Sequence, residues 1–310
     1  MGKMISMLRY KIISAGILFL ILLSTGLAQK PQFMQLILLG TGYPYPSAEQ
    51  AGPSCAIVVG ERAFIVDAGR GVGMHIAATG LTWSSIVAAF LTHLHSDHID
   101  GLPDLFHSSW EFGAGKPFEL YGPKGTQEVA NGLLQFYGPD ILIRRDLTEK
   151  LSAEGARINV HEIQEGVVYN LPDVVKITAF LEDHPPVKPA FGYRFDAGRH
   201  SIVITGDTRP NQNLVKFAAG ADILVHEAYV RRSSTAGADD DQRWSVYKYH
   251  SSAREAGETA AKAKVKTLVL THLFPASASE QEFLDEAKKS FSGKIIVGRD
   301  LTSLKLTLDD

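Results

Sequence analysis

Short apolar runs that end at a glycine or a polar turn recur along most of this chain. Three of them follow one another near the start, at 34–40, 55–60 and 63–69, and a fourth spans 84–92. Runs of this length, rich in Val, Ile and Leu and closed by turn residues, are typical of buried β-strands. The pattern therefore predicts four strands in the first third of the chain.

Strands and helices alternate in the rest of the chain. We expect strands near 157–162, 174–181, 190–195, 201–205, 222–226 and 265–270, and helices near 124–138, 211–219, 252–264 and 278–290. Two mixed sheets packed against each other, with the helices outside, would bury such a set of elements. The predicted fold class is α+β.

The first 28 residues have a different pattern. Lys3, Arg9 and Lys11 precede an apolar run at 12–23, and the small residues of 26–28 follow it. This order is typical of a secretory signal peptide cleaved after Ala28, whereas an uncleaved anchor would have only the 18 uncharged residues of 12–29 to span a bilayer. We therefore expect a signal peptide at 1–28, one domain at 32–310, and an exported protein, periplasmic or secreted, with no stable membrane association after cleavage.

Composition narrows the functional classes. The chain has 310 residues, of which 45% are hydrophobic and 21% charged, enough for a sizeable core. Its net charge of -3 lacks the basic excess that nucleic-acid-binding proteins usually show. Cys55 is the single cysteine of the sequence, so no intramolecular disulfide can form.

The stretch LTHLHSDHIDG, at 91–101, concentrates titratable side chains directly after a predicted strand. It carries His93, His95, Asp97 and His98 within six positions. A turn after the strand would let imidazoles and a carboxylate converge on one point, which a continuing strand would prevent. Neutral imidazole and carboxylate are preferred ligands of zinc and related divalent metals. The stretch therefore predicts a metal site.

Two more candidate ligands follow predicted strands. Asp207 comes after the run SIVIT and His272 after TLVL, so both are expected at strand ends, as His93 is. His184 precedes Pro185 and Pro186, which places it on a loop. Side chains at the same edge of two packed sheets can meet, and we expect these to do so.

Taken in order, these motifs resemble the metallo-β-lactamase superfamily, with Asp67 in VDAGRG as a further match. The resemblance implies an αββα sandwich with two metal ions, zinc by availability and iron or manganese as alternatives, at the edge between the sheets. It implies that Asp67 lies behind the ligands and accepts a hydrogen bond that orients an imidazole. The implied ligands are His93, His95 and His184 for one ion, Asp97, His98 and His272 for the other, and Asp207 between them.

Within the superfamily, the motifs YGPKG, FGYR, GDTRP, HEA and HSS resemble the ribonuclease Z and arylsulfatase branch. The resemblance implies that His226 of HEA protonates the leaving group, while Asp97 orients the attacking water. His250 of HSS stays open between a substrate contact and an ordinary surface residue.

One departure from that branch argues against transfer RNA as the substrate. Only residues 195–205 separate FGYR from GDTRP, where bacterial ribonucleases Z carry an RNA-gripping arm. Together with the signal peptide, this leads us to expect an exported binuclear zinc hydrolase acting on a phosphodiester or a related small anionic ester. The alternatives are an arylsulfatase or lactonase with the same site and, from another class, a non-catalytic metal-binding module. The oligomeric state stays open, including a homodimer.

Overall fold

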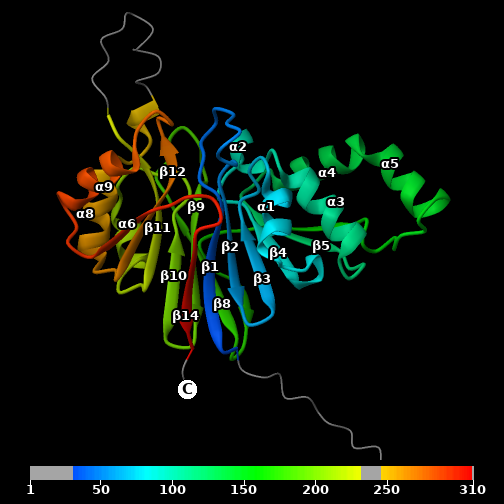
Figure 1. Ribbon diagram of the computed structural model, residues 1–310. Helices are drawn as coiled ribbons and strands as arrows, with labels where there is room; N and C mark the ends of the chain where they lie inside the picture. Colours follow the sequence, from blue (N-terminus) through cyan, green and yellow to red (C-terminus); the bar gives the residue numbers. More distant parts are fainter. Residues whose placement is uncertain (1–30, 232–245, 309–310) are drawn as a thin grey trace, which may run out of the picture.

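Two seven-stranded β-sheets pack face to face, and helices cover their outer faces (Figure 1). This computed structural model describes residues 31–231 and 246–308. Each sheet contains both parallel and antiparallel pairs, so the expected α+β sandwich of two mixed sheets is confirmed. The predicted signal peptide at 1–28 lies outside the described residues.

The first sheet has the order β14-β1-β2-β3-β4-β5-β6. Its pairs are antiparallel from β14 to β3 and parallel from β3 to β6. Parallel neighbours need crossover connections, and helices supply them here. The strands are β1 (Phe33–Gly40), β2 (Ser54–Val59), β3 (Arg62–Val66), β4 (Ile86–Phe90), β5 (Phe118–Gly122), β6 (Ile158–Glu162) and β14 (Ser303–Thr307). The helices of this half are α1 (Val72–Thr79), η1 (Trp83–Ser85), α2 (Ser96–Ile99), α3 (Leu102–Phe112), α4 (Thr126–Phe136), α5 (Gly138–Leu142) and η2 (Ile143–Leu147).

The second sheet has the order β13-β12-β11-β10-β9-β8-β7. It is antiparallel from β7 to β10 and parallel from β10 to β13. The strands are β7 (Gly166–Leu171), β8 (Val175–Leu181), β9 (Phe191–Ala197), β10 (His200–Ile204), β11 (Ile223–Tyr229), β12 (Thr267–Phe274) and β13 (Lys294–Val297). The helices are α6 (Gln212–Phe217), η3 (Val246–Lys248), α8 (Ala253–Ala263) and α9 (Glu280–Lys288).

The central strands are apolar on both faces because each sheet is covered on both sides. In β1, Met34, Leu36 and Leu38 enter the core between the sheets, whereas Ile37 and Leu39 pack under the helices of the first half. Burial of both faces explains why the run at 34–40 is uninterrupted and shows no alternation.

The prediction missed three of the four strands at the sheet edges. β7, β13 and β14 were not expected, and β14 alternates exposed with half-buried positions. An edge strand with one face against water lacks the continuous apolar run that revealed the inner strands. Helices α1 and α3 were also missed, although α3 buries Leu102, Leu105, Phe106 and Trp110 at helical spacing.

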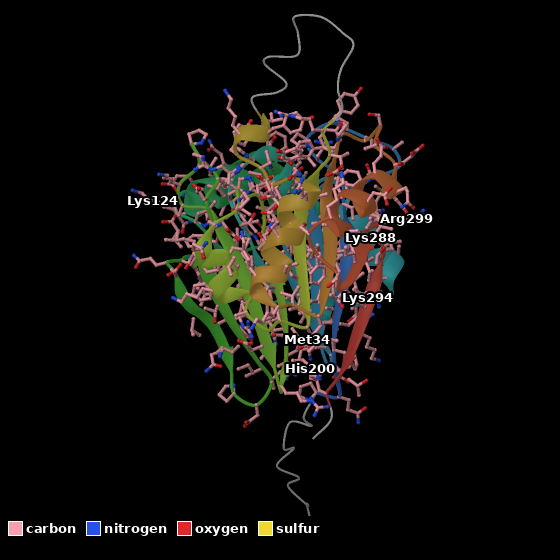
Figure 2. The ribbon with its side chains drawn as sticks, turned by 90° about the vertical axis from the view of Figure 1, so that its left-hand side faces the viewer. Met34, Lys124, His200, Lys288, Lys294 and Arg299 are labelled. Atoms are coloured by element: carbon pink, nitrogen blue, oxygen red, sulfur yellow. The ribbon has the colours of Figure 1, made fainter. Side chains whose placement is uncertain are left out.

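The carboxyl-terminal ends of β3, β4, β10, β11 and β12 gather at one end of the sandwich, the upper end in Figure 1. Figure 2 shows the opposite end as well, with Met34 near the start of β1 and His200 at the start of β10, both low in that view. Among the described residues, no helix is long and apolar enough to cross a membrane.

Candidate metal centre

The loop after β4 turns at once into the short helix α2, and this turn gathers the side chains of the HxHxDH motif. His93 and His95 precede α2, while Asp97 and His98 lie within it. Asp67 holds the start of the turn, because its Oδ1 accepts a hydrogen bond from the Thr92 amide at 2.8 Å. His95 is exposed, so the turn stays open to solvent on one side.

The structure brings all seven expected ligand residues together, and within each of the groups below the donor atoms all lie within 4.8 Å of one another. His184 reaches the cluster from the loop between β8 and β9, and Asp207 from the loop after β10. His272 lies at a bulge in β12 with a φ of 48°, which re-aims its side chain relative to the strand. The groups are His93, His95, His184 and Asp207; Asp97, His98 and His272; and Asp207, Glu227, His250 and His272.

Asp207 connects the two halves of the cluster. Its Oδ2 lies 3.7 Å from His93 Nε2 and 3.8 Å from His184 Nε2. Its Oδ1 lies 3.3 Å from His98 Nε2 and 3.5 Å from His272 Nε2. Ligands bound tetrahedrally at zinc distances sit about 3.3 Å apart. The spacing therefore fits two cations that share one carboxylate.

Hydrogen bonds at the outer ring nitrogen turn three imidazoles toward the cluster. His98 Nδ1 donates to Asp67 Oδ2 at 2.7 Å, and His184 Nδ1 donates to the Tyr249 carbonyl at 3.0 Å. His93 Nδ1 lies 3.0 Å from Thr92 Oγ1. In each ring Nε2 then points toward the cluster and can bind a cation. Hydrogen bonds at the other ring nitrogen generally orient metal-binding histidines in this way.

Several buried polar atoms at the centre have no hydrogen-bond partner, as is expected of atoms that bind a metal ion. They are His93 Nε2, His98 Nε2 and Asp207 Oδ1. Buried polar atoms are rarely left without a partner, and two divalent cations that share Asp207 would satisfy all three.

The electrostatics of the cluster also favour a cation. Burial lowers the pKa of His93, His95 and His184, which keeps these imidazoles in the neutral form that binds metals. Burial also opposes protonation of His98, but the carboxylates of Asp207 and Asp67 outweigh it and raise that pKa. The excess of carboxylate charge that raises it would equally attract a metal ion.

His226 does not reach this cluster. Along β11 successive side chains alternate between faces. Leu224 and Ala228, two positions either side of His226, pack in the core beneath α8, whereas Val225 enters the core between the sheets. His226 is fully buried, its Nδ1 bonds the Glu227 carbonyl at 2.8 Å, and burial lowers its pKa to about 4.

Glu227 and His250 occupy the position that the sequence interpretation had given to His226. Glu227 Oε2 lies 2.6 Å from His250 Nδ1, and Glu227 Oε1 accepts a hydrogen bond from the Thr208 amide. The His250 ring stacks on His272 at a centroid distance of 5.6 Å. Strand alternation was the available signal, because it places Glu227 on the same face as Val225 and His226 on the other.

The arrangement has the parts of a metal-dependent hydrolase. Two cation-sized positions share Asp207, one side of the cluster is open, and a histidine paired with a carboxylate stands beside it. Paired metal sites of this kind activate water and stabilise charge on a phosphoryl or acyl group.

Comparisons with known proteins agree with this geometry. The family model described as "Beta-lactamase superfamily domain" matches residues 62–273. The chain is 41% identical over 277 residues to a protein named ribonuclease Z from Mycobacterium bovis (strain BCG / Pasteur 1173P2), covering 86% of this chain and 96% of that one.

Solved structures show the same fold. The metallo-β-lactamase fold protein YhfI from Bacillus subtilis superposes with a TM-score of 0.69 at 22% identity, covering 88% of this chain and 99% of that one. Human tRNase Z, short form, gives a TM-score of 0.64 at 22% identity over 87% of this chain and 98% of that one. The sandwich described above is therefore the metallo-β-lactamase fold.

Proposed function

This chain belongs to the β-lactamase superfamily and, within it, to the ribonuclease Z family, and from that premise we propose that it cleaves phosphodiester bonds in transfer RNA precursors. It is a metal-dependent hydrolase of the phosphodiesterase type. The observation that carries the proposal is the 41% identity to a ribonuclease Z across 96% of that relative.

Three expectations from the sequence are wrong. The relatives overturn an exported hydrolase of small esters, because a nucleic-acid-processing function fits them better. They overturn export for the same reason, since an RNA-processing enzyme must work where its RNA is made. They also overturn the argument against transfer RNA as a substrate.

The absence of an arm between β9 and β10 does not exclude transfer RNA as a substrate, because RNA contacts need not come from one segment of the chain. Ala197 pairs directly with His200 across the turn between β9 and β10, so no arm is inserted there. Nucleic acids are bound largely through phosphate contacts, which exposed cations elsewhere on the surface can supply.

We assign two zinc ions to the cluster, on the support of its spacing and of its partnerless buried atoms. His93, His95 and His184 would hold one ion and Asp97, His98 and His272 the other, with Asp207 shared between them. When bound, the ions would acidify water and neutralise charge on the phosphate. Asp97 can also orient the attacking water, because its carboxylate sits in the cluster 3.3 Å from His272 Nε2.

The Glu227–His250 pair is our candidate for protonating the departing ribose oxygen. An alkyl oxygen is a poor leaving group and needs a proton from a positioned acid. Glu227 fixes the His250 ring through Nδ1, and hydrogen bonding there orients an imidazole for proton transfer at Nε2. This assignment replaces His226, which lies on the other face of β11.

Three exposed lysines flank the cluster and are candidates for phosphate contacts. Lys124 lies in the turn between β5 and α4, Lys188 follows His184 on its loop, and Lys248 closes η3 just before His250. Figure 2 shows Lys124 projecting from the upper part of the molecule. Arg194, by contrast, already donates to Asp196 at 2.8 Å and to the Phe217 carbonyl at 2.8 Å.

The direct test uses zinc-loaded full-length protein and a transfer RNA precursor with a 3′ extension. We expect one cut that releases the extension, abolished by chelation and by Asp207→Ala. Hydrolysis of bis(p-nitrophenyl) phosphate without any cleavage of the RNA would overturn the proposed substrate while leaving the hydrolase assignment in place.

A further inference from the structure

A row of four aromatic rings passes beside the candidate metal centre, where one of its middle rings, Phe274, contacts His250 and His272. Tyr247 stacks on Phe274 with ring centroids 5.8 Å apart and 18° between the planes. Phe274 stacks on Tyr43 at 5.9 Å and 29°, and Tyr43 stacks on Tyr45 at 6.3 Å and 22°. Offset stacking at these distances is a favourable arrangement for aromatic pairs. The four rings form one continuous, nearly parallel stack, called the aromatic row below.

The aromatic row is attached directly to the proposed catalytic residues. Phe274 follows His272 by two positions in β12, and its ring lies edge-on to His272 at 5.9 Å and to His250 at 5.2 Å. Tyr43 and Tyr45 come from the loop between β1 and β2. This loop is held against β12, because the Leu273 amide donates to the Thr41 carbonyl at 2.9 Å. The row therefore has a defined position beside the site.

The two ends of the aromatic row differ. At the inner end, Tyr247 contacts the Tyr229 ring at 4.4 Å and the Arg231 guanidinium at 5.7 Å. Phe274, in the middle, is only 6% exposed. At the outer end, Tyr45 is 70% exposed, and Tyr43 is the one ring it contacts among the described residues. A large ring with an open face extends the stack into solvent.

We propose that Tyr45 stacks a nucleobase of the RNA close to the scissile phosphate. The inference rests on the proposed function and adds a binding subsite to it. Every nucleobase has a flat face, and exposed aromatic side chains beside a phosphate-binding site are the usual platforms for single-stranded RNA. A base on Tyr45 would continue the row as its fifth ring and would hold the RNA chain beside the cluster while the scissile phosphate lies there.

Packing alone accounts for Tyr43 but not for Tyr45. Tyr43 stacks with two rings, Phe274 and Tyr45, and so helps to hold the loop. Tyr45 has one stacked side and lies mostly in water, where its ring adds little to the core. Tyr45 is therefore the position at which recognition of a base can be tested without disturbing the fold.

The test compares Tyr45→Ala and Tyr45→Phe on precursor RNAs that carry a single abasic nucleotide at successive positions around the cleavage site. On intact RNA, Tyr45→Ala should lower kcat/KM by about 5- to 150-fold, the effect of losing one stacked base. Tyr45→Phe keeps the ring and should stay within about twofold of the wild type. When the abasic nucleotide is the one that stacks on Tyr45, kcat/KM of the wild type should fall by the same factor relative to intact RNA. On that substrate kcat/KM of Tyr45→Ala should not fall below its value on intact RNA.

Failure of the inference is distinguishable from failure of the proposed function. Wild-type rates for Tyr45→Ala on intact RNA would overturn the inference alone, as would an equal loss on every abasic substrate. Absence of RNA cleavage by the zinc-loaded wild type would overturn the proposed function itself. Unchanged zinc content and unchanged Tm of both variants serve as the folding control.

Discussion

Glu227 Oε2 lies 2.6 Å from His250 Nδ1, buried within the group of side chains that contains Asp207 and His272. The two residues lie on separate elements, β11 and the segment after η3, and meet only in the folded protein. Burial raises the pKa of Glu227 and lowers the pKa of His250, so both shifts favour a proton on the carboxyl beside the imidazole. The pair provides a proton source next to the shared carboxylate of the cluster.

His250→Ala should therefore cost about 10²- to 10⁴-fold in kcat on RNA, the usual worth of a positioned proton donor. On bis(p-nitrophenyl) phosphate the loss should be small, because nitrophenolate departs without a proton. Metal content should be unchanged. His226→Asn is the matched control, and its effect should be the same on both substrates. A selective loss on RNA in His226→Asn, with His250→Ala near wild type, would return the role to His226.

Metal content tests the cluster itself. Full-length protein should hold two ions per chain by elemental analysis, since the seven donor residues form two groups that share Asp207. His272→Ala should lose one ion and keep the other, because the group of His93, His95 and His184 is intact. Asp207→Ala should weaken both positions. A stoichiometry of one ion in the wild type would contradict the binuclear assignment.

Stability should depend on pH through His226. Its pKa is about 4 in the folded protein, lowered by burial from an ordinary value of 6.5. The unfolded chain therefore binds a proton at His226 as the pH falls below 6.5, while the folded chain does not. The free energy of unfolding therefore falls by about 3 kcal/mol through this group as the pH drops from 6.5 to 4. Below pH 4 this group causes no further loss.

The measurement is the free energy of unfolding of wild type and His226→Asn across that range. At pH 7 the variant should be the less stable protein, because it loses packing. The difference in the free energy of unfolding between the two proteins should shrink by about 3 kcal/mol as the pH falls to 4, since only the wild type carries the titrating group. A constant gap from pH 7 to 4 would show that His226 is not buried in its neutral form.

The three flanking lysines should appear in the salt dependence of RNA binding. Each phosphate contact contributes about 0.7 to 0.9 to the slope of log K against log salt. Lys124→Ala, Lys188→Ala and Lys248→Ala should each lower that slope by about 1. Lys294→Ala is the control, because this lysine begins β13, away from the cluster, and its removal should leave the slope unchanged (Figure 2). If Lys294→Ala and Lys124→Ala lowered the slope equally, the effect would come from the net charge of the protein and not from phosphate contacts beside the cluster.

Much of the fold could be predicted from the sequence for a simple physical reason. The inner strands are buried on both faces, so they read as unbroken apolar runs, and α8 and α9 begin at capping boxes formed by Ser252 with Glu255 and Ser279 with Glu282. The edge strands β7 and β14 expose part of one face to water and carry no such run, and β13 has only three apolar residues in a row, 295–297. Their existence depends on the neighbouring strand that they pair with.

The clustering of the donors was also predictable, because the residues that follow strands at one sheet edge must meet. The proton donor was not. His226 and Glu227 are neighbours in one motif, but their side chains leave β11 on opposite faces. Which face points toward the cluster is decided by how β11 packs between its two cores. His250 lies 23 positions further along and reaches Glu227 through the segment that precedes α8.

The sequence by itself determined the inner strands of two mixed sheets and the places of the motif residues after those strands, because apolar runs and turn residues are local patterns. The ligand set and the class of hydrolysis were implied by the resemblance to a known family. The tertiary structure alone decided which histidine stands beside the cluster and that four rings from three separate segments stack into one row. Both are relations between residues far apart in the chain, and no local pattern encodes the direction in which a side chain points once two sheets have packed together.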